Sequence, residues 1–146
     1  MHFITYTTLS LLALATSATA TFAQVNNNCP IPIWITITNA TQQPSQYAVP
    51  INGTYLQGRS GIGNAFGLSK TSAYFSPQTP KWTLGFTDSP QDGLLYWSVI
   101  NADGDAFAGL AWRVSFSDPA CPAMTAYDGG IVHTCAITAN LTVTLC

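Results

Sequence analysis

The chain has 146 residues, of which only 7% are charged, and its formal net charge is −2. An average soluble domain has about 25% charged residues, so this surface must consist largely of uncharged polar side chains. The basic residues are few and scattered: Arg59, Lys70, Lys81 and Arg113. Because a nucleic-acid binder needs a basic stripe to neutralise phosphates, the composition excludes that class of protein.

The first 20 residues are typical of a secretory signal peptide. An apolar block over residues 9–15 is about as long as a signal h-region and far shorter than the roughly 20 residues of a membrane helix. Small residues up to Ala20 form an Ala-x-Ala cleavage signal, and cleavage after Ala23 is the alternative. We therefore expect a mature single domain over residues 21–146 that is secreted, extracellular or cell-wall-associated, and does not enter a membrane.

The rest of the chain shows the signals of strands and turns, with hardly a helix. Apolar and polar residues alternate, or β-branched and aromatic residues gather, over eight segments: 31–38, 47–51, 54–57, 81–87, 94–100, 110–117, 130–135 and 140–146. Residues 58–67 form a glycine-rich segment between two of them. Turn signals recur about every ten residues, the spacing of an all-β sandwich or barrel.

Cysteines and glycosylation sequons agree with export. Four cysteines in a short exported chain indicate two disulfides and leave the pairing open: Cys29, Cys121, Cys135 and Cys146. No C-x-x-C pair is present, which argues against a zinc site. N-glycosylation sequons, which suit an exposed surface, begin at three positions: Asn39, Asn52 and Asn140.

Several short motifs resemble the thaumatin-like superfamily. Residues 21–29, Thr-Phe-x-x-Val-Asn-Asn-Asn-Cys, followed by Ile33-Trp34, look like its opening strand pair. Residues 96–104 resemble its Tyr-Asp-Val-Ser strand and Asp-Gly loop. The small size, the loop over residues 103–109 and the terminal Leu-Thr-Val-Thr-Leu-Cys are closer still to the fungal BYS1-type secreted proteins, a short branch with a thaumatin-like fold.

This resemblance implies a β-sandwich whose first and last strands are neighbours. It would place Cys29 against Cys146 and leave Cys121 to pair with Cys135. Larger thaumatin-like proteins have more disulfides and an acidic cleft, which in some members binds or cleaves β-glucan. Trp97 stands where their strand motif usually has Asp, which puts an acidic cleft in this chain in doubt.

The acidic residues do not predict an active site. Glycoside hydrolysis needs two carboxyl groups about 5 to 9 Å apart, and this chain has no Glu. Four Asp residues lie near Pro or Gly, where Asp normally caps a turn: Asp88, Asp92, Asp118 and Asp128. Asp103 and Asp105 could share the rim of a site. The calcium-like pattern that they form with Asn101 lacks the Gly and the Glu of an EF-hand loop, so no metal or other cofactor is expected.

Histidine and serine add no catalytic residue. His133 is interpreted as a strand residue beside Cys135 rather than as a base or metal ligand. No Gly-x-Ser-x-Gly elbow is present, and cysteines paired in disulfides cannot act as nucleophiles.

Aromatic side chains are the remaining signal for a binding site. Four tryptophans lie on four different predicted strands, and exposed coplanar rings could stack on sugars, whereas core packing is the alternative. Trp34 and Trp97 are expected in the core. Trp82 and Trp112, together with Asp103 and Asp105, are the candidate contacts for a ligand. Tyr96 should point to the opposite face of its strand from Trp97.

These observations predict a non-enzymatic secreted monomer that engages a neutral glycan or a host surface protein. One alternative is a weak β-glucan hydrolase that uses Asp103 and a second Asp. Another is a secreted effector or antigen that acts through protein contact alone. An acidic groove would favour the hydrolase, a flat row of exposed Trp or Tyr would favour glycan binding, and neither feature would favour protein contact.

Overall fold

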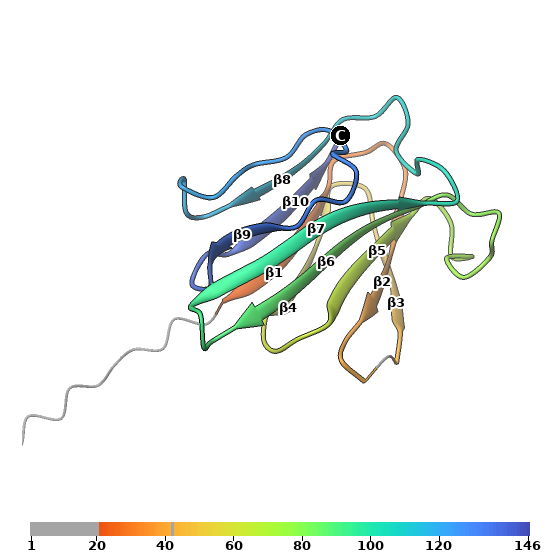
Figure 1. Ribbon diagram of the computed structural model, residues 1–146. Helices are drawn as coiled ribbons and strands as arrows, with labels where there is room; N and C mark the ends of the chain where they lie inside the picture. Colours follow the sequence, from red (N-terminus) through yellow and green to blue (C-terminus); the bar gives the residue numbers. More distant parts are fainter. Residues whose placement is uncertain (1–20, 42) are drawn as a thin grey trace, which may run out of the picture.

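The computed structural model describes residues 21–41 and 43–146, so the predicted signal segment, residues 1–20, lies outside the described part. Ten strands form two β-sheets that pack face to face (Figure 1). No helix among the described residues is long and apolar enough to cross a membrane. The prediction of an all-β sandwich is confirmed.

The smaller sheet has four strands in the order β4-β1-β10-β8. These strands are β1 (Phe22–Asn27), β4 (Gly53–Gly58), β8 (Trp112–Phe116) and β10 (Leu141–Leu145). β1 and β10 run parallel, with Val25 opposite Val143, and the other two pairs are antiparallel. The first and last strands are therefore neighbours, as the family resemblance implies.

The larger sheet has six strands in the order β3-β2-β5-β6-β7-β9. These strands are β2 (Ile33–Thr38), β3 (Ser45–Val49), β5 (Asn64–Ser69), β6 (Lys81–Ser89), β7 (Leu94–Ala102) and β9 (His133–Ala136). Side chains in β6 and most of β7 are alternately buried and partly exposed, as expected of strands with one face on the core. Trp97 is buried between the sheets and Tyr96 is partly exposed, which agrees with their predicted opposite directions.

Both disulfides follow the pairing that the resemblance implies, Cys29 with Cys146 and Cys121 with Cys135. The first joins the ends of the parallel strands β1 and β10. It closes a segment of 117 residues, whereas the second bridges cysteines 14 residues apart. The longer bridge therefore ties together the two ends of the domain.

A buried amide fixes the turn between β3 and β4. Asn27 Nδ2 donates hydrogen bonds to the carbonyl oxygens of Ile31, Val49 and Pro50, at 2.9, 3.0 and 3.1 Å. Asn27 Oδ1 accepts a hydrogen bond from Cys29 N at 3.0 Å. Because buried polar groups are stable only when they are bonded, this side chain holds the end of β3 and the turn after it against the end of β1.

Two features differ from the sequence predictions. Strand β5 is missing from the predicted strands because it falls in the glycine-rich segment, where small residues obscure the alternation. A Cβ at Gly67 would lie 2.2 Å from the ring of Tyr74, so the glycine lets this ring rest on the sheet. Trp34 was predicted in the core but is partly exposed, because Ile33 and Ile35 take the inward positions of β2.

Candidate functional site

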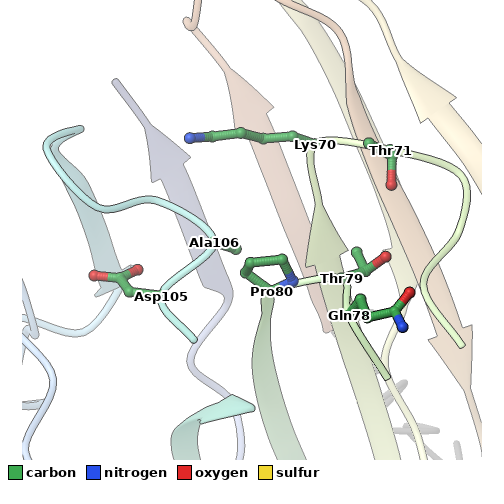
Figure 2. A pocket seen from close by; sticks show the side chains of 7 residues that line it. All are labelled: Lys70, Thr71, Gln78, Thr79, Pro80, Asp105 and Ala106. Atoms are coloured by element: carbon green, nitrogen blue, oxygen red, sulfur yellow. The ribbon is translucent and has the colours of Figure 1, made fainter. Parts of the chain in front are cut away.

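A surface pocket lies at one end of the larger sheet, where β5 and β7 end and β6 begins. It encloses about 240 Å³ and is lined by Lys70, Thr71, Gln78, Thr79, Pro80, Asp105 and Ala106 (Figure 2). The antiparallel register brings these three strand ends together, since Leu68 lies opposite Trp82 and Lys81 opposite Ala102. With one cation, one anion and several amide or hydroxyl groups, the pocket suits a small polar ligand without net charge.

Asp103 and Asp105 do not form a carboxylate pair in this pocket. Asp105 lines it, and Asp105 Oδ1 accepts a hydrogen bond from Phe107 N at 2.9 Å, which is a turn-capping role. Asp103 lies outside the lining and forms an ion pair with Lys81, which also donates to the carbonyl oxygen of Ser76 at 3.0 Å. The rim that Asp103 and Asp105 could have shared therefore contains only the carboxylate of Asp105.

Of the two alternatives for Trp82 and Trp112, stacking on a ligand or packing in the core, the structure favours the core. Trp82 is 0% exposed and Trp112 is 9% exposed, and their rings meet edge to face with centroids 5.3 Å apart. Trp82 also packs edge to face on Phe107 at 6.5 Å. Trp82 is therefore a core residue. Trp112 also packs on the core, and the part of it that stays accessible lines a surface pocket with Arg113 and Thr144.

Asp88 was predicted to serve a turn and instead forms a buried ion pair. It lies in β6, is 4% exposed, and its Oδ1 is 2.9 Å from Nε of Arg59. Burial raises the pKa of Asp88 and lowers the pKa of Arg59, while their mutual attraction opposes both shifts. Nothing in the local pattern around either residue indicates this partnership, since they lie on different segments of the chain.

The other Asp residues mostly behave as predicted. Asp118 and Asp128 cap turns by accepting hydrogen bonds from Ala120 N and Gly130 N, at 2.9 and 3.1 Å. Asp92, in the turn before β7, accepts a hydrogen bond from Ser89 Oγ at 2.8 Å.

His133 lies in β9, as predicted, and has two partners that the sequence did not indicate. Its Nε2 is 2.6 Å from Asp128 Oδ2, and its ring lies over Trp97 with centroids 4.7 Å apart. The hydrogen bond from His133 is the main cause that holds the pKa of Asp128 below its ordinary value. Among residues 21–41 and 43–146, no three His, Cys or Asp side chains gather where they could hold a metal ion.

The three sequons have different surroundings. Asn39 is exposed, and its Oδ1 accepts hydrogen bonds from Thr41 N at 3.0 Å and Thr41 Oγ1 at 2.6 Å. Asn52 is exposed in the β3–β4 turn, with a positive φ of 57°. Asn140 is half-buried, and its Oδ1 accepts a hydrogen bond from Phe22 N at 3.1 Å. The first two side chains therefore have the more open surroundings.

Comparisons with known proteins agree with this fold. A family model described as "Bys1: Blastomyces yeast-phase-specific protein" matches residues 10–146. No curated protein sequence matches the chain.

Two solved structures show the same architecture at low sequence identity. The crystal structure of the protein elicitor MoHrip2 from Magnaporthe oryzae has a TM-score of 0.72 and 18% identity, and covers 87% of this chain and 99% of that chain. The structure of the thaumatin-like xylanase inhibitor TLXI has a TM-score of 0.57 and 10% identity, and covers 85% of this chain and 98% of that one. At these identities, the likeness establishes a thaumatin-like fold and nothing about the ligand.

Proposed function

Because the chain belongs to the Bys1 family, we propose that it is a secreted, non-enzymatic thaumatin-like protein that binds a neutral glycan at a cell wall or cell surface. Two disulfides and three sequons support an extracellular site of action, since disulfides persist in oxidising compartments. The signal-like sequence of residues 1–20 supports export.

The observation that carries this proposal is that the carboxylates of the chain are already bonded to other groups of the fold. The chain has no Glu, and every Asp has a partner within the described fold. The partners, in chain order from Asp88 to Asp128, are Arg59, Ser89, Lys81, Phe107 N, Ala120 N and His133. Hydrolysis of a glycosidic bond needs a protonated carboxyl group near a second carboxylate, and five surface pockets in residues 21–41 and 43–146 hold at most one carboxylate each.

The polar surface supports a neutral ligand. With charged residues at 7% of the chain, recognition must rely on amides, hydroxyl groups and aromatic rings. These groups bind the hydroxyl groups and apolar faces of uncharged sugars by hydrogen bonds and stacking.

Protein contact is the second candidate, and one surface favours it. Ile100 on β7 and Tyr127, Ile131 and Val132 before β9 are each about half exposed or more. A Cβ at Gly130 would lie 3.7 Å from Ile100 Cγ1 and 4.0 Å from Tyr127 Oη, so Ile100 and Tyr127 lie close to each other around this glycine. The two structural neighbours, a protein elicitor and a xylanase inhibitor, also favour this candidate.

The test is a pull-down of the purified, disulfide-bonded protein with insoluble β-1,3-glucan, chitin and cellulose, with released sugar assayed in the supernatant. We expect retention on at least one polysaccharide and no released sugar. Sugar release that Asp103→Asn or Asp105→Asn abolishes would replace the proposal with the hydrolase. Absence of both retention and release would leave protein contact as the better candidate.

A further inference from the structure

We propose that the glycan-binding surface of this chain is the uncharged edge of the sandwich formed by β3 and β4, where Tyr47 and Tyr55 stack. This inference rests on the proposed function and gives it a location. The two rings have centroids 5.7 Å apart and planes inclined by 27°, although they belong to different sheets. Tyr47 is 50% exposed, so with one face against Tyr55 it can offer the other face to a sugar ring.

The inner ring of this pair is held rigidly. Tyr55 packs edge to face on Phe66 at 5.9 Å, and Phe66 packs in the same way on Phe86 at 5.1 Å. Tyr55 Oη donates a hydrogen bond to Gln57 Oε1 at 3.2 Å. Burial, together with the nearby phenol of Tyr47, raises the pKa of Tyr55, which keeps this donor protonated. The ring of Tyr47 therefore packs on a series of aromatic rings that extends into the core.

A pocket without charged side chains lies beside the tyrosines and shares Gln57 with them. It encloses about 280 Å³, and its polar lining is made by Asn39, Thr41, Gln57, Ser60 and Asn64. Alternate residues of a strand lie about 6.8 Å apart on one face, so Tyr55 and Gln57 are spaced on the order of one sugar unit. Tyr47 lies a further 5.7 Å from Tyr55 between ring centroids, so a chain of about two or three sugar units that begins on Tyr47 can reach the amides and hydroxyl groups of the pocket.

The walls of the pocket are fixed before any ligand binds. Asn64 Nδ2 donates to the carbonyl oxygens of Ser60 and Gly61 at 3.0 and 3.2 Å, and Asp88 N donates to the same carbonyl of Gly61 at 3.0 Å. At the other end of the edge, Asn27 holds the β3–β4 turn. Because both ends are ordered by buried side chains, binding loses little conformational entropy.

The chemistry of this edge selects the ligand class. Strands β3 and β4 contain no Asp, Lys or Arg, and neither does the lining of the pocket. An acidic or basic polysaccharide would find no counter-charge here, whereas a neutral chain can stack on Tyr47 and bond to uncharged amides. The pocket in Figure 2 has Lys70 and Asp105 and no aromatic ring in its lining, so it lacks the stacking element.

The experiment compares four variants with the wild type on the polysaccharide that retains the wild type, among β-1,3-glucan, chitin and cellulose. Tyr47→Ala should weaken the apparent affinity about fivefold to tenfold, because the stacking ring is lost. Tyr47→Phe should bind like the wild type. Tyr127→Ala is the matched control, since it removes a ring of similar exposure, 47%, on a different part of the surface. Gln57→Leu should also weaken binding, because the amide of the pocket is lost.

The outcomes separate this inference from the function on which it rests. If the wild type is retained and Tyr47→Ala binds equally well, the site is overturned while glycan binding stands. If Tyr127→Ala weakens binding as much as Tyr47→Ala, the location is also overturned. If the wild type binds none of the three polysaccharides, the proposed function fails and this site fails with it. Unchanged thermal unfolding of Tyr47→Ala would show that its loss of binding is local.

Discussion

Arg59 and Asp88 form an ion pair inside the sandwich, with Nε and Oδ1 2.9 Å apart and both side chains almost completely buried. The remaining guanidinium nitrogens of Arg59 donate to the carbonyl oxygens of Ala139, at 2.7 Å, and Ile137. One side chain thus joins the segment after β4 to β6 and to the β9–β10 connection. The loop that forms a wall of the proposed glycan pocket comes directly after Arg59 in the chain.

Removal of one partner of this pair should destabilise the protein strongly. Asp88→Asn leaves the buried guanidinium without its counter-charge, and breaking a buried pair in this way costs about 3–5 kcal/mol. The free energy of unfolding from urea titration should fall by that amount. Asp92→Asn, at an exposed position, is the control and should change it by less than about 0.5 kcal/mol. A loss as small as the control's would show that the pair contributes little to stability.

The pair of Asp128 and His133 predicts a dependence of stability on pH. The pKa of Asp128 is lowered in the folded protein, first by the hydrogen bond with His133 and further by the backbone N–H groups of Gly130 and Ile131. A carboxyl group with a lowered folded pKa stabilises the fold above its unfolded pKa of about 3.9, and this contribution disappears as pH falls through the folded value. The difference in unfolding free energy between wild type and Asp128→Asn should therefore shrink below about pH 4. A difference that stays constant down to pH 2 would contradict this role.

The burial of Trp82 predicts a loss of stability without a specific loss of binding. Trp82→Ala removes a fully buried indole between Phe107 and Trp112, and such a change costs about 3–5 kcal/mol. Chemical denaturation measures this cost, and Tyr127→Ala should show almost none. At a temperature where Trp82→Ala is folded, its retention on polysaccharide should equal that of the wild type. Weaker binding by the folded variant would restore Trp82 as a ligand contact.

Much of the fold can be predicted from the sequence. The alternation of apolar and polar residues marks the strands, and the cysteines indicate the disulfides. From Lys81 to Thr87, apolar residues alternate with polar or small ones in β6, so the inward face of this part is evident from the residue types, whereas Asp88 further along also points inward. The sequence does not predict β5, because its outward positions hold the small residues Ala65 and Gly67. Polar side chains at these positions would have shown the alternation of a strand. Trp34 was misplaced because a tryptophan on a strand can lie against either face of a sheet, and only the neighbours decide which.

The candidate site was less predictable because its parts meet only in three dimensions. Tyr47 and Tyr55 belong to strands of different sheets, so no spacing rule relates their rings. Likewise, Arg59 and Asp88 are a loop cation and a strand anion whose partnership depends on sheet packing. The turn signals around Asp118 and Asp128, by contrast, gave the right role because an Asp that caps a turn bonds within a few residues.

The two disulfides should differ in their contribution to stability. A bridge that closes a longer segment removes more entropy from the unfolded chain. With cysteines 117 residues apart, Cys29–Cys146 should contribute nearly 5 kcal/mol, and with cysteines 14 residues apart, Cys121–Cys135 should contribute about 3 kcal/mol. Calorimetry of the two paired Cys→Ala variants should give the lower melting temperature for the variant without Cys29–Cys146. The reverse order would show that effects in the folded state outweigh chain entropy.

N-glycosylation at Asn39 should reduce polysaccharide binding. Asn39 lines the uncharged pocket beside Tyr47 and Tyr55, so a glycan attached to its Nδ2 would extend over the groups that bind the ligand. Protein secreted by a glycosylating host should therefore bind less than its Thr41→Ala variant, which lacks this sequon. Thr142→Ala removes the Asn140 sequon instead and should leave binding unchanged.

A second control is needed because Thr41 itself lines the pocket. Protein made in a bacterial periplasm has no N-glycans, so the effect of Thr41→Ala on that protein measures the contribution of the Thr41 hydroxyl group alone. Equal binding by the protein with an occupied Asn39 and by the variant without the sequon would place the ligand away from this pocket.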